Sequence, residues 1–341
     1  MGIIVIVSGN TKGLDLTQSS SAEIDLFGDR FERIASNVET VIQGKREVIE
    51  LMLLALVSEG HVLVEDVPGV GKTQLAKSIA RSIHGVFHRI QFTPDLLPSD
   101  VTGISVWDRD RHEFEFKPGP IFANIVVGDE INRASPKTQS ALLEAMEERQ
   151  VTSDGVTRQV PLPFMVIATQ NPLEHEGTYP LPEAQLDRFM MRVVVGYPSR
   201  QKELEILDTH GIRSTFLDLE PVAGTDDIER MIQIARRISV SQSVKNYIVD
   251  LVEGTRHHPD VMLGASPRSA LFLQRLSRAR AASKGRDYVM PDDIKALAYP
   301  VLEHRMATRP EAQMRGLSIS NLISDVLSSI QVPGTTSRIA T

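Results

Sequence analysis

The sequence predicts an α/β domain built on a five-stranded parallel sheet, followed by a small domain made only of helices. Two observations support this prediction. Up to Tyr197, short apolar runs alternate with helical patterns, and beyond it only helical periodicity is found. Apolar runs separated by helices are typical of parallel strands that are buried on both faces of a sheet. A length of 341 residues also suits two domains.

The composition narrows the classes of protein. Hydrophobic residues make up 41% and charged residues 24% of the chain, which allows a sizeable core and excludes disorder of the whole chain. Because there is no cysteine, disulfides, thiolate metal sites and a cysteine nucleophile are excluded. The net charge of −7 makes nucleic acid an unfavourable partner. No apolar run has the length of a membrane-spanning helix, so we expect a cytoplasmic protein without membrane insertion.

The first part of the chain is expected to contain a tail, two helices and the first strand. Residues 1–26 begin with a stretch rich in Ser, Thr and Gly and are expected to form a flexible N-terminal tail. The α/β core domain is expected over residues 27–197. It opens with helices at Phe27–Ile42 and Lys45–Glu59, where apolar residues recur at helical spacing. The apolar run His61–Glu65 then predicts a short buried strand.

Four further strands and two helices complete the core domain. The strands are predicted at Phe87–Phe92, Asn124–Glu130, Pro163–Asn171 and Met190–Tyr197, and the helices at Thr73–Ile83 and Ser135–Glu148. Two inserts interrupt this alternation, and each predicts a β-hairpin. Residues 101–118 contain WDRDRHEFEF, which alternates around a charged tip, and residues 150–162 contain Asp154-Gly155, a dipeptide typical of tight hairpin turns.

The second domain is predicted to be a helical lid over residues 198–320, followed by a C-terminal tail at 321–341. Helix start signals such as Ser266-Pro267 and Pro291-Asp292 support this interpretation. The helices are predicted at Arg200–Leu207, Asp226–Ile238, Ser243–His257, Pro267–Ser283 and Pro291–His304.

The segment EDVPGVGKT predicts a phosphate-binding loop, because a strand precedes it and a helix follows it. Gly69 and Gly71 let the backbone wrap around phosphates, and the helix N-terminus adds its dipole. Lys72 would reach the β- and γ-phosphates, and Thr73 would place its hydroxyl on Mg²⁺. Asp66 stands where the usual motif has its first glycine. The alternative is a chance Gly/Lys turn that opens a helix.

The segment IVVGDE runs from apolar residues directly into two carboxylates. A parallel strand that ends in this way places Asp129 and Glu130 at the edge where α/β proteins bind ligands. Asp129 suits a Mg²⁺ site, and Glu130 suits the base that activates an attacking water. Taken singly, two solvated carboxylates at a strand end are the commoner case, but coupling to the Lys72 loop makes that interpretation unlikely.

An amide and three arginines are weaker candidates. Asn171 ends an apolar strand and could hold a water beside the γ-phosphate, although an asparagine before Pro172 also favours a plain turn. Arg268 lies in the first turn of a predicted helix, where the dipole disfavours a cation, so an anionic partner would account for it. Arg133 and Arg188 complete the set. Most arginines are surface residues without such a role.

Taken together, these segments resemble the MoxR family of AAA+ ATPases over about Phe27 to Arg309. The resembling stretches are VIQGK from Val41, EDVPGVGKT from Glu65, QFTPDLLPSDVTG from Gln91, FKPGPIFANIVVGDEINRASPKTQSALLEAMEE from Phe116, ATQNPLEHEGTYPLPEAQLDRF from Ala168 and GASPRS from Gly264. The resemblance implies a P-loop ATPase core with a helical lid, and ATP with Mg²⁺ as the bound species. The family's loop often lacks the first glycine.

The resemblance also implies a role for each site residue. Lys72, Glu130, Asn171 (sensor 1), Arg188 (arginine finger) and Arg268 (sensor 2) would be catalytic, with Arg268 reporting the γ-phosphate to the lid. Metal binding would fall to Thr73 and Asp129. Nucleotide binding would fall to Ile42, Gln43, Gly44, Pro68, Gly69, Val70, Gly71, Lys72, Thr73, Gln74, Asp129 and Arg133. Arg188 would act on the neighbouring subunit's nucleotide, and Arg133 could face the same nucleotide.

The implied assembly is a hexameric ring, since an arginine supplied by a neighbour demands a head-to-tail contact, which closes into a ring. The implied role is chaperone-like remodelling of a protein client, together with a partner that carries a von Willebrand factor A (VWA) domain. A nucleic-acid motor is the alternative, but the first hairpin tip, 108–111, is balanced in charge and the second hairpin offers only Arg158. A nucleotide-dependent scaffold with little turnover is a third interpretation.

Overall fold

The structure, a computed structural model, describes residues 19–67, 69–171, 178–198, 200–201, 203–204 and 215–334. Its centre is a five-stranded sheet in the order β2-β5-β8-β1-β9, in which all neighbouring strands are parallel. This confirms the predicted sheet. The strands are β1 (Val62–Glu65), β2 (Phe87–Gln91), β5 (Ile125–Asp129), β8 (Met165–Gln170) and β9 (Met191–Val193).

Both faces of the sheet are covered, because successive side chains of a strand point to opposite sides. On β5, Ile125 and Val127 join the hydrophobic cluster formed with helices α1, α2, α3 and the lid, whereas Val126 joins a second cluster with α5. The helices of the core are α1 (Ser21–Glu39), α2 (Arg46–Val57), α3 (Lys72–Ser82), α4 (Pro98–Thr102), α5 (Pro136–Glu148) and α6 (Glu183–Leu186), with a short 3-10 turn η1 (Ile131–Arg133).

The first helix begins earlier than the sequence analysis expected, so the predicted flexible tail over 1–26 is wrong for its last residues. Helix α1 begins at Ser21, and Ser20 caps it by accepting from the backbone N–H of Glu23. The Glu23 side chain accepts in return from the Ser20 backbone, which completes a capping box. Ile24 is buried, so this turn also contributes to the core.

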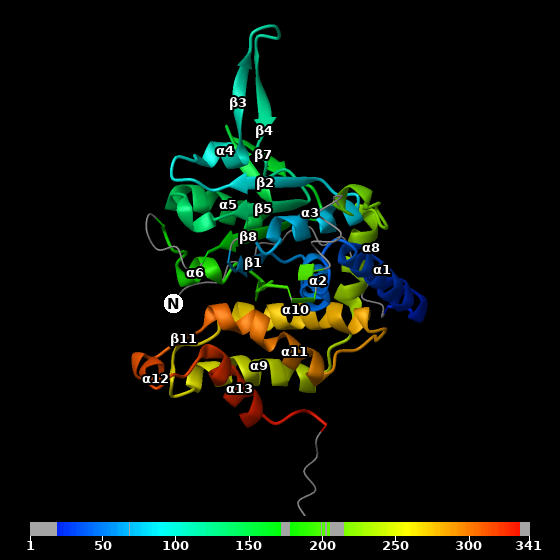
Figure 1. Ribbon diagram of the computed structural model, residues 1–341, viewed down its shortest axis with the longest axis vertical. Coiled ribbons are helices and arrows are strands. Elements are labelled where there is room, and N and C mark those ends of the chain that lie inside the picture. Colours follow the sequence, from blue (N-terminus) through cyan, green and yellow to red (C-terminus); the bar gives the residue numbers. More distant parts are fainter. Residues whose placement is uncertain are drawn as a thin grey trace, which may run out of the picture.

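Both predicted hairpins are confirmed. The first pairs β3 (Gly103–Asp108) with β4 (Glu113–Pro118), and the second pairs β6 (Gln150–Ser153) with β7 (Val156–Gln159). Figure 1 shows β3 and β4 standing out from one end of the molecule, opposite the lid helices. The hairpins touch near their bases. The Arg158 guanidinium lies 3.8 Å from the centre of the Phe116 ring.

The lid is helical, as predicted, and also contains a two-stranded antiparallel sheet of β10 (Val261–Leu263) and β11 (Ala307–Thr308) that periodicity did not indicate. Its helices are α8 (Thr225–Arg237), α9 (Gln242–His257), α10 (Pro267–Ser283), α11 (Pro291–Leu302), α12 (Pro310–Met314) and α13 (Ile319–Ser329), with 3-10 turns η2 (Thr215–Asp218) and η3 (Glu303–Arg305). Of the predicted helix at Arg200–Leu207, the structure describes 200–201 and 203–204, and the other positions lie outside the described residues.

The expected tail over 321–341 is corrected for its first part. Helix α13 runs to Ser329 and buries Leu322, Ile323 and Val326 against the rest of the lid. The helix was not expected, although its apolar residues follow helical spacing. In the described part of the chain, no helix combines the length and apolar character needed to span a bilayer.

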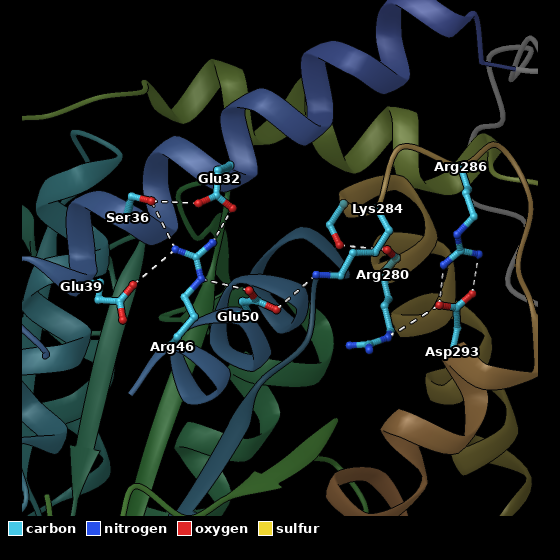
Figure 2. Close-up of polar contacts among 10 residues, drawn as sticks. Glu32, Ser36, Glu39, Arg46, Glu50, Arg280, Lys284, Arg286 and Asp293 are labelled. Atoms are coloured by element: carbon cyan, nitrogen blue, oxygen red, sulfur yellow. Dashed lines mark hydrogen bonds and ion pairs between the residues drawn. The ribbon is translucent and has the colours of Figure 1, made fainter. Parts of the chain in front are cut away.

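The lid packs directly on the core through one continuous hydrophobic cluster that includes α1, α2 and α10. A polar network lies over the same junction, as Figure 2 shows. Arg46 of α2 binds carboxylates of α1 and α2, including Glu50 at 2.9 Å, and Lys284 at the end of α10 lies 3.7 Å from that same Glu50. The boundary between 197 and 198 stays a prediction.

Candidate active site

A cavity of about 530 Å³ lies where the carboxyl ends of the central strands meet the N-terminus of α3. Parallel strands end at the same edge of a sheet, so residues far apart in the sequence meet there. The lining residues are Gly69, Gly71, Lys72, Thr73, Gln74, Lys77, Arg89, Asp129, Glu130, Thr169 and Asn171. The structure thus brings together the predicted loop, the two carboxylates and the predicted amide.

The loop before α3 has the backbone conformation that its glycines allow. Gly69 and Gly71 have φ of 86° and 88°, a left-handed region that favours glycine. An added Cβ at either position would meet nothing within 4 Å, so backbone conformation and not crowding requires glycine. Helix α3 begins at Lys72, and its first turn holds no acidic residue, so its free amides can bind an anion. Pro68 lies outside the described residues.

The Lys72 ammonium is held in the cavity. Its Nζ donates to the backbone carbonyl of Asp66 at 2.8 Å. Partial burial lowers the pKa of Lys72, while the carboxylates of Asp66, Asp129 and Glu130 oppose that shift. A cation bonded to one backbone oxygen keeps two further N–H groups for phosphate oxygens.

Asp66, which replaces the usual first glycine, has a structural role. Its carboxylate is buried and accepts from the backbone N–H of Val67 at 2.8 Å and of Gly196 at 2.5 Å. The second bond ties the loop to the chain that follows β9. Lys45 donates to the neighbouring carbonyl of Tyr197 at 2.8 Å, so the VIQGK segment is anchored beside the same loop.

Asp129 is oriented by two residues that the sequence analysis did not select. The hydroxyl of Thr169 donates to Asp129 Oδ1 at 2.5 Å, and Arg89 donates to Oδ2 from Nη2 at 2.6 Å. The Thr73 hydroxyl and the Asp129 carboxylate offer the oxygen ligands that Mg²⁺ prefers. No cluster of three or more metal-binding acidic or histidine side chains occurs among the described residues. This small donor set fits Mg²⁺, which is usually completed by water and phosphate.

Glu130 is held in an unusual conformation at the end of β5. Its φ is 57°, and its backbone N–H donates to Thr169 Oγ1 at 3.0 Å. Glu130 Oε2 accepts from Gln91 Nε2 at 2.7 Å and from Arg133 Nη1 at 2.9 Å. Non-glycine residues in this region often occur at functional sites. Arg133 therefore lies beside the cavity of its own chain.

The other predicted site residues form three groups: some line this cavity, some lie outside it, and Arg188 and Arg268 line a second cavity. Asn171 is 9% exposed and lines the cavity with Gln74, as expected. Val70 and Ile42 pack against the hydrophobic core, and neither they nor Gln43 and Gly44 line this cavity. The buried Gln43 Oε1 has no hydrogen-bond partner in the described part of the chain. Contact of these residues with a nucleotide stays a prediction.

Arg188 and Arg268 lie elsewhere and do not line the Lys72 cavity of their own chain, so their expected roles at a γ-phosphate stay predictions. Both bind Glu147 of α5: Arg188 Nε lies 3.2 Å from Oε2, and Arg268 Nη2 contacts Oε1. They line a second cavity of about 410 Å³, which they share with Arg149 and Arg275. We call these four arginines and Glu147 the Glu147 cluster. Its positive excess makes it suited to an anion.

Some of the residues missed by sequence reasoning left a weak signal. Thr169 lies two positions before Asn171, so strand alternation puts both on one face. Arg89 and Gln91 follow the same alternation on β2, which pairs with β5 so that Gln91 lies beside Asp129. That pairing could not be known before the strand order was known. Glu147 carries no sequence signal that distinguishes it from other surface carboxylates.

Comparisons with known proteins agree with this geometry. The model of the ATPase family associated with various cellular activities (AAA) matches residues 61–191, and the AAA lid domain matches residues 253–326. The chain is 50% identical to the uncharacterized protein YeaC of Bacillus subtilis over 301 residues, which are 88% of this chain and 94% of YeaC. It is 42% identical to chaperone MoxR1 of Mycobacterium tuberculosis over 311 residues, 89% of this chain and 82% of MoxR1.

Two further likenesses extend over almost the whole chain. Protein MoxR of Methylorubrum extorquens is 32% identical over 329 residues, 89% of this chain and 94% of that protein. The crystal structure of a Cytophaga hutchinsonii protein assigned as an ATPase superposes with a TM-score of 0.86 at 37% identity, covering 94% of this chain and 99% of that chain.

Proposed function

Because the chain belongs to the MoxR family of AAA+ ATPases, we propose that it hydrolyses ATP with Mg²⁺ in the Lys72 cavity, within a ring of identical subunits. One observation carries the proposal. Lys72 and Thr73, the carboxylates Asp129 and Glu130, and the amide of Asn171 converge on one cavity from separate segments. Phosphoryl transfer needs this combination of cation, metal ligands and water-orienting groups.

The binding step follows from the loop. The amides after Gly69 and Gly71 surround the β-phosphate, and the Lys72 ammonium bridges the β- and γ-phosphates. Thr73 and Asp129 would hold Mg²⁺, which would neutralise charge that develops on the phosphates. The unpartnered Gln43 Oε1 supports an adenine site at residues 42–44, because an exocyclic amino group can donate to it.

The hydrolysis step falls to Glu130 and Asn171. Glu130 orients a water and accepts its proton while the water oxygen bonds to the γ-phosphorus and the bond from phosphorus to the β,γ-bridging oxygen breaks. Gln91 and Arg133 hold one carboxylate oxygen of Glu130, which keeps the base in place. Asn171 adds an amide that fixes the water or the γ-phosphate.

The Glu147 cluster supports a site completed by a neighbour. Arg188 and Arg268 lie outside the Lys72 cavity of their own chain, and Arg89 inside it is bonded to Asp129. In comparable systems an arginine supplied to the γ-phosphate by a neighbour contributes about 10³–10⁵ in rate. We therefore assign both arginines to the cavity of the adjacent subunit. Such a head-to-tail contact closes into a ring, and a hexamer is the size that the family implies.

The client is proposed to be a protein that the ring remodels, with a VWA-domain protein as partner. Support comes from the projecting β3–β4 hairpin, where Trp107 and Phe114 are 47% and 71% exposed and their rings pack edge to face. Exposed aromatic side chains suit a protein surface. The nucleic-acid alternative finds no basic surface here, because Asp108 and Asp110 accompany Arg109 and Arg111 at the tip.

The test is steady-state ATP hydrolysis per chain against protein concentration, with the oligomeric state measured at each concentration. We expect the specific rate to rise with assembly and then reach a plateau, and to vanish when EDTA removes Mg²⁺. Glu130→Gln should bind ATP without hydrolysing it, which separates binding from chemistry. A monomer with an undiminished rate would contradict the shared site, and full activity in EDTA would contradict the metal.

A further inference from the structure

One carboxylate of the core is bonded to two separate segments of the lid. Asp187 lies between α6 and β9, and Ser266 Oγ lies 2.9 Å from each of its carboxylate oxygens. Arg305 Nε donates to Asp187 Oδ1 at 2.9 Å. Ser266 is the N-cap residue of α10, whereas Arg305 ends η3. Asp187 therefore fixes both segments to the core.

Arg305 also grips the backbone around this carboxylate. Its side chain is 1% exposed and donates to the carbonyls of Asp187 and Met190, each at 3.3 Å, and contacts that of Phe189. Burial lowers the pKa of Arg305 to about 10, and the Asp187 carboxylate opposes the shift. A cation this deeply buried depends on its carboxylate partner. Arg305 of the lid thus binds the backbone of the segment that carries Arg188.

The same connection reaches both arginines of the Glu147 cluster. Arg188 directly follows Asp187 in the chain, and Arg268 lies two residues after Ser266 in the first turn of α10. Their guanidinium groups meet at Glu147, so the two side chains already point to one place. Asp187 links the two backbones that carry them, and it lines neither the Lys72 cavity nor the cavity of the cluster.

We propose that Asp187 is a positioning residue that holds Arg188 and Arg268 as one unit, at the spacing that lets both bind the same transferring phosphoryl group. This inference rests on the proposed function, in which these arginines complete the neighbour's site. A displacement of about 1 Å in such a group can cost about a hundredfold in rate. The substrate itself is bound by the Lys72 loop of the other chain, so its affinity does not depend on Asp187.

The first experiment is Asp187→Asn, which keeps the shape of the side chain and removes its charge. We expect kcat to fall at least tenfold while the KM for ATP stays within about twofold. The matched control is Asp293→Asn. Asp293 is a buried carboxylate of the lid that likewise pairs with arginines, Arg286 and Arg280, but at the opposite end of α10 (Figure 2). Its loss should lower stability and leave kcat close to that of the wild type.

The second experiment separates positioning from general damage. Asp187→Asn chains are co-expressed with Glu130→Gln chains, and mixed rings are purified through two different affinity tags. The Asp187→Asn chain keeps an intact Lys72 cavity, and the Glu130→Gln chain keeps intact arginines. We expect mixed rings to hydrolyse ATP several-fold faster than the sum of the two separate variants. A merely misfolded Asp187→Asn chain could not be rescued in this way.

A reference mixture makes the outcomes distinguishable. Arg188→Ala chains with Glu130→Gln chains should show the same rescue. If only the reference mixture recovers activity, Asp187 is not a positioning residue and the proposed function stands. If neither recovers, the shared site fails, and the inference falls with it. Should Asp187→Asn not fold, Ser266→Ala replaces it, with Ser318→Ala, the N-cap serine of α13, as its control. Equal kcat in these two variants would overturn the proposal.

Discussion

The Lys72 cavity and the Glu147 cluster are built in different ways. The cavity combines cationic groups with carboxylates on strand ends, so one chain supplies the loop and the residues proposed as metal ligands and base. The cluster lies in a cavity that four arginines share with two carboxylates: Glu147 binds Arg188 and Arg268, and Glu59 binds Arg149. The first region is suited to a nucleotide, whereas the second holds more arginines than carboxylates, which suits it to an anion. Under the proposed function, the first surface binds the nucleotide and the second completes a neighbour's site.

The largest expected effect comes from the cavity. Lys72→Ala should weaken ATP binding at least a hundredfold and abolish hydrolysis, because the substituted residue can no longer offset the charge of the β- and γ-phosphates. Titration with a fluorescent ATP analogue measures the affinity. Lys245→Ala, on the exposed face of α9, is the control and should bind normally. Tight ATP binding by Lys72→Ala would show that the Lys72 cavity is not the nucleotide site.

The next effect comes from the cluster. Arg188→Ala should lower kcat by about a thousandfold while ATP affinity changes less than about threefold. Rates from coupled ATPase assays and affinities from the same titration test this split. Arg230→Ala, an exposed arginine of α8, serves as control. A parallel loss of affinity in Arg188→Ala would mean that the cluster binds nucleotide itself, and the division between the two regions would fail.

A smaller effect is expected at Thr169, where a substitution tests how Asp129 and Glu130 are oriented in the cavity. Thr169→Val keeps the shape but removes the hydroxyl that donates to Asp129 and accepts from the Glu130 backbone. Unpaired polar groups at a buried position cost about 1–3 kcal/mol, so kcat should fall about tenfold to a hundredfold. More Mg²⁺ should be needed for half-maximal activity. Thr169→Ser should retain most of the rate, and equal rates in Thr169→Val would show that the hydroxyl is dispensable.

The last effect concerns folding stability and leaves turnover unchanged; it arises at His61, beside the cluster. Complete burial lowers the pKa of His61 from 6.5 to about 4. The unfolded chain therefore binds a proton at a higher pH than the folded chain does. The free energy of unfolding should then fall as the pH drops from about 6.5 towards 4, by up to about 3 kcal/mol. Burial shifts the pKa of His304 in the same direction.

Urea unfolding at several pH values between 7 and 4.5 measures this dependence. His61→Gln should show a flatter profile than the wild type, because the titrating ring between Met146 and Val166 is gone. If the free energy of unfolding of His61→Gln depends on pH as steeply as that of the wild type, other groups cause the acid sensitivity.

Local sequence patterns predicted most of the strands and helices, and they predicted the Lys72 loop with Asp129 and Glu130. The strands follow from apolar runs, and the Lys72 loop from a contiguous motif whose residues act together wherever the loop lies. The predicted boundaries at 26 and 321 are wrong because α1 and α13 begin directly after the capping serines Ser20 and Ser318, which are local start signals.

The sequence by itself determined the nucleotide loop and its paired carboxylates, because bonded neighbours and strand ends need no distant information. Only the tertiary structure decided that Arg89, Gln91 and Thr169 orient those carboxylates, since strand order and register place them there. It also decided where Arg268 lies. That position depends on the packing of α10 against α1 and α2 and on the bonds of Asp187 to Ser266 and Arg305, contacts between residues far apart in the chain that no local pattern encodes.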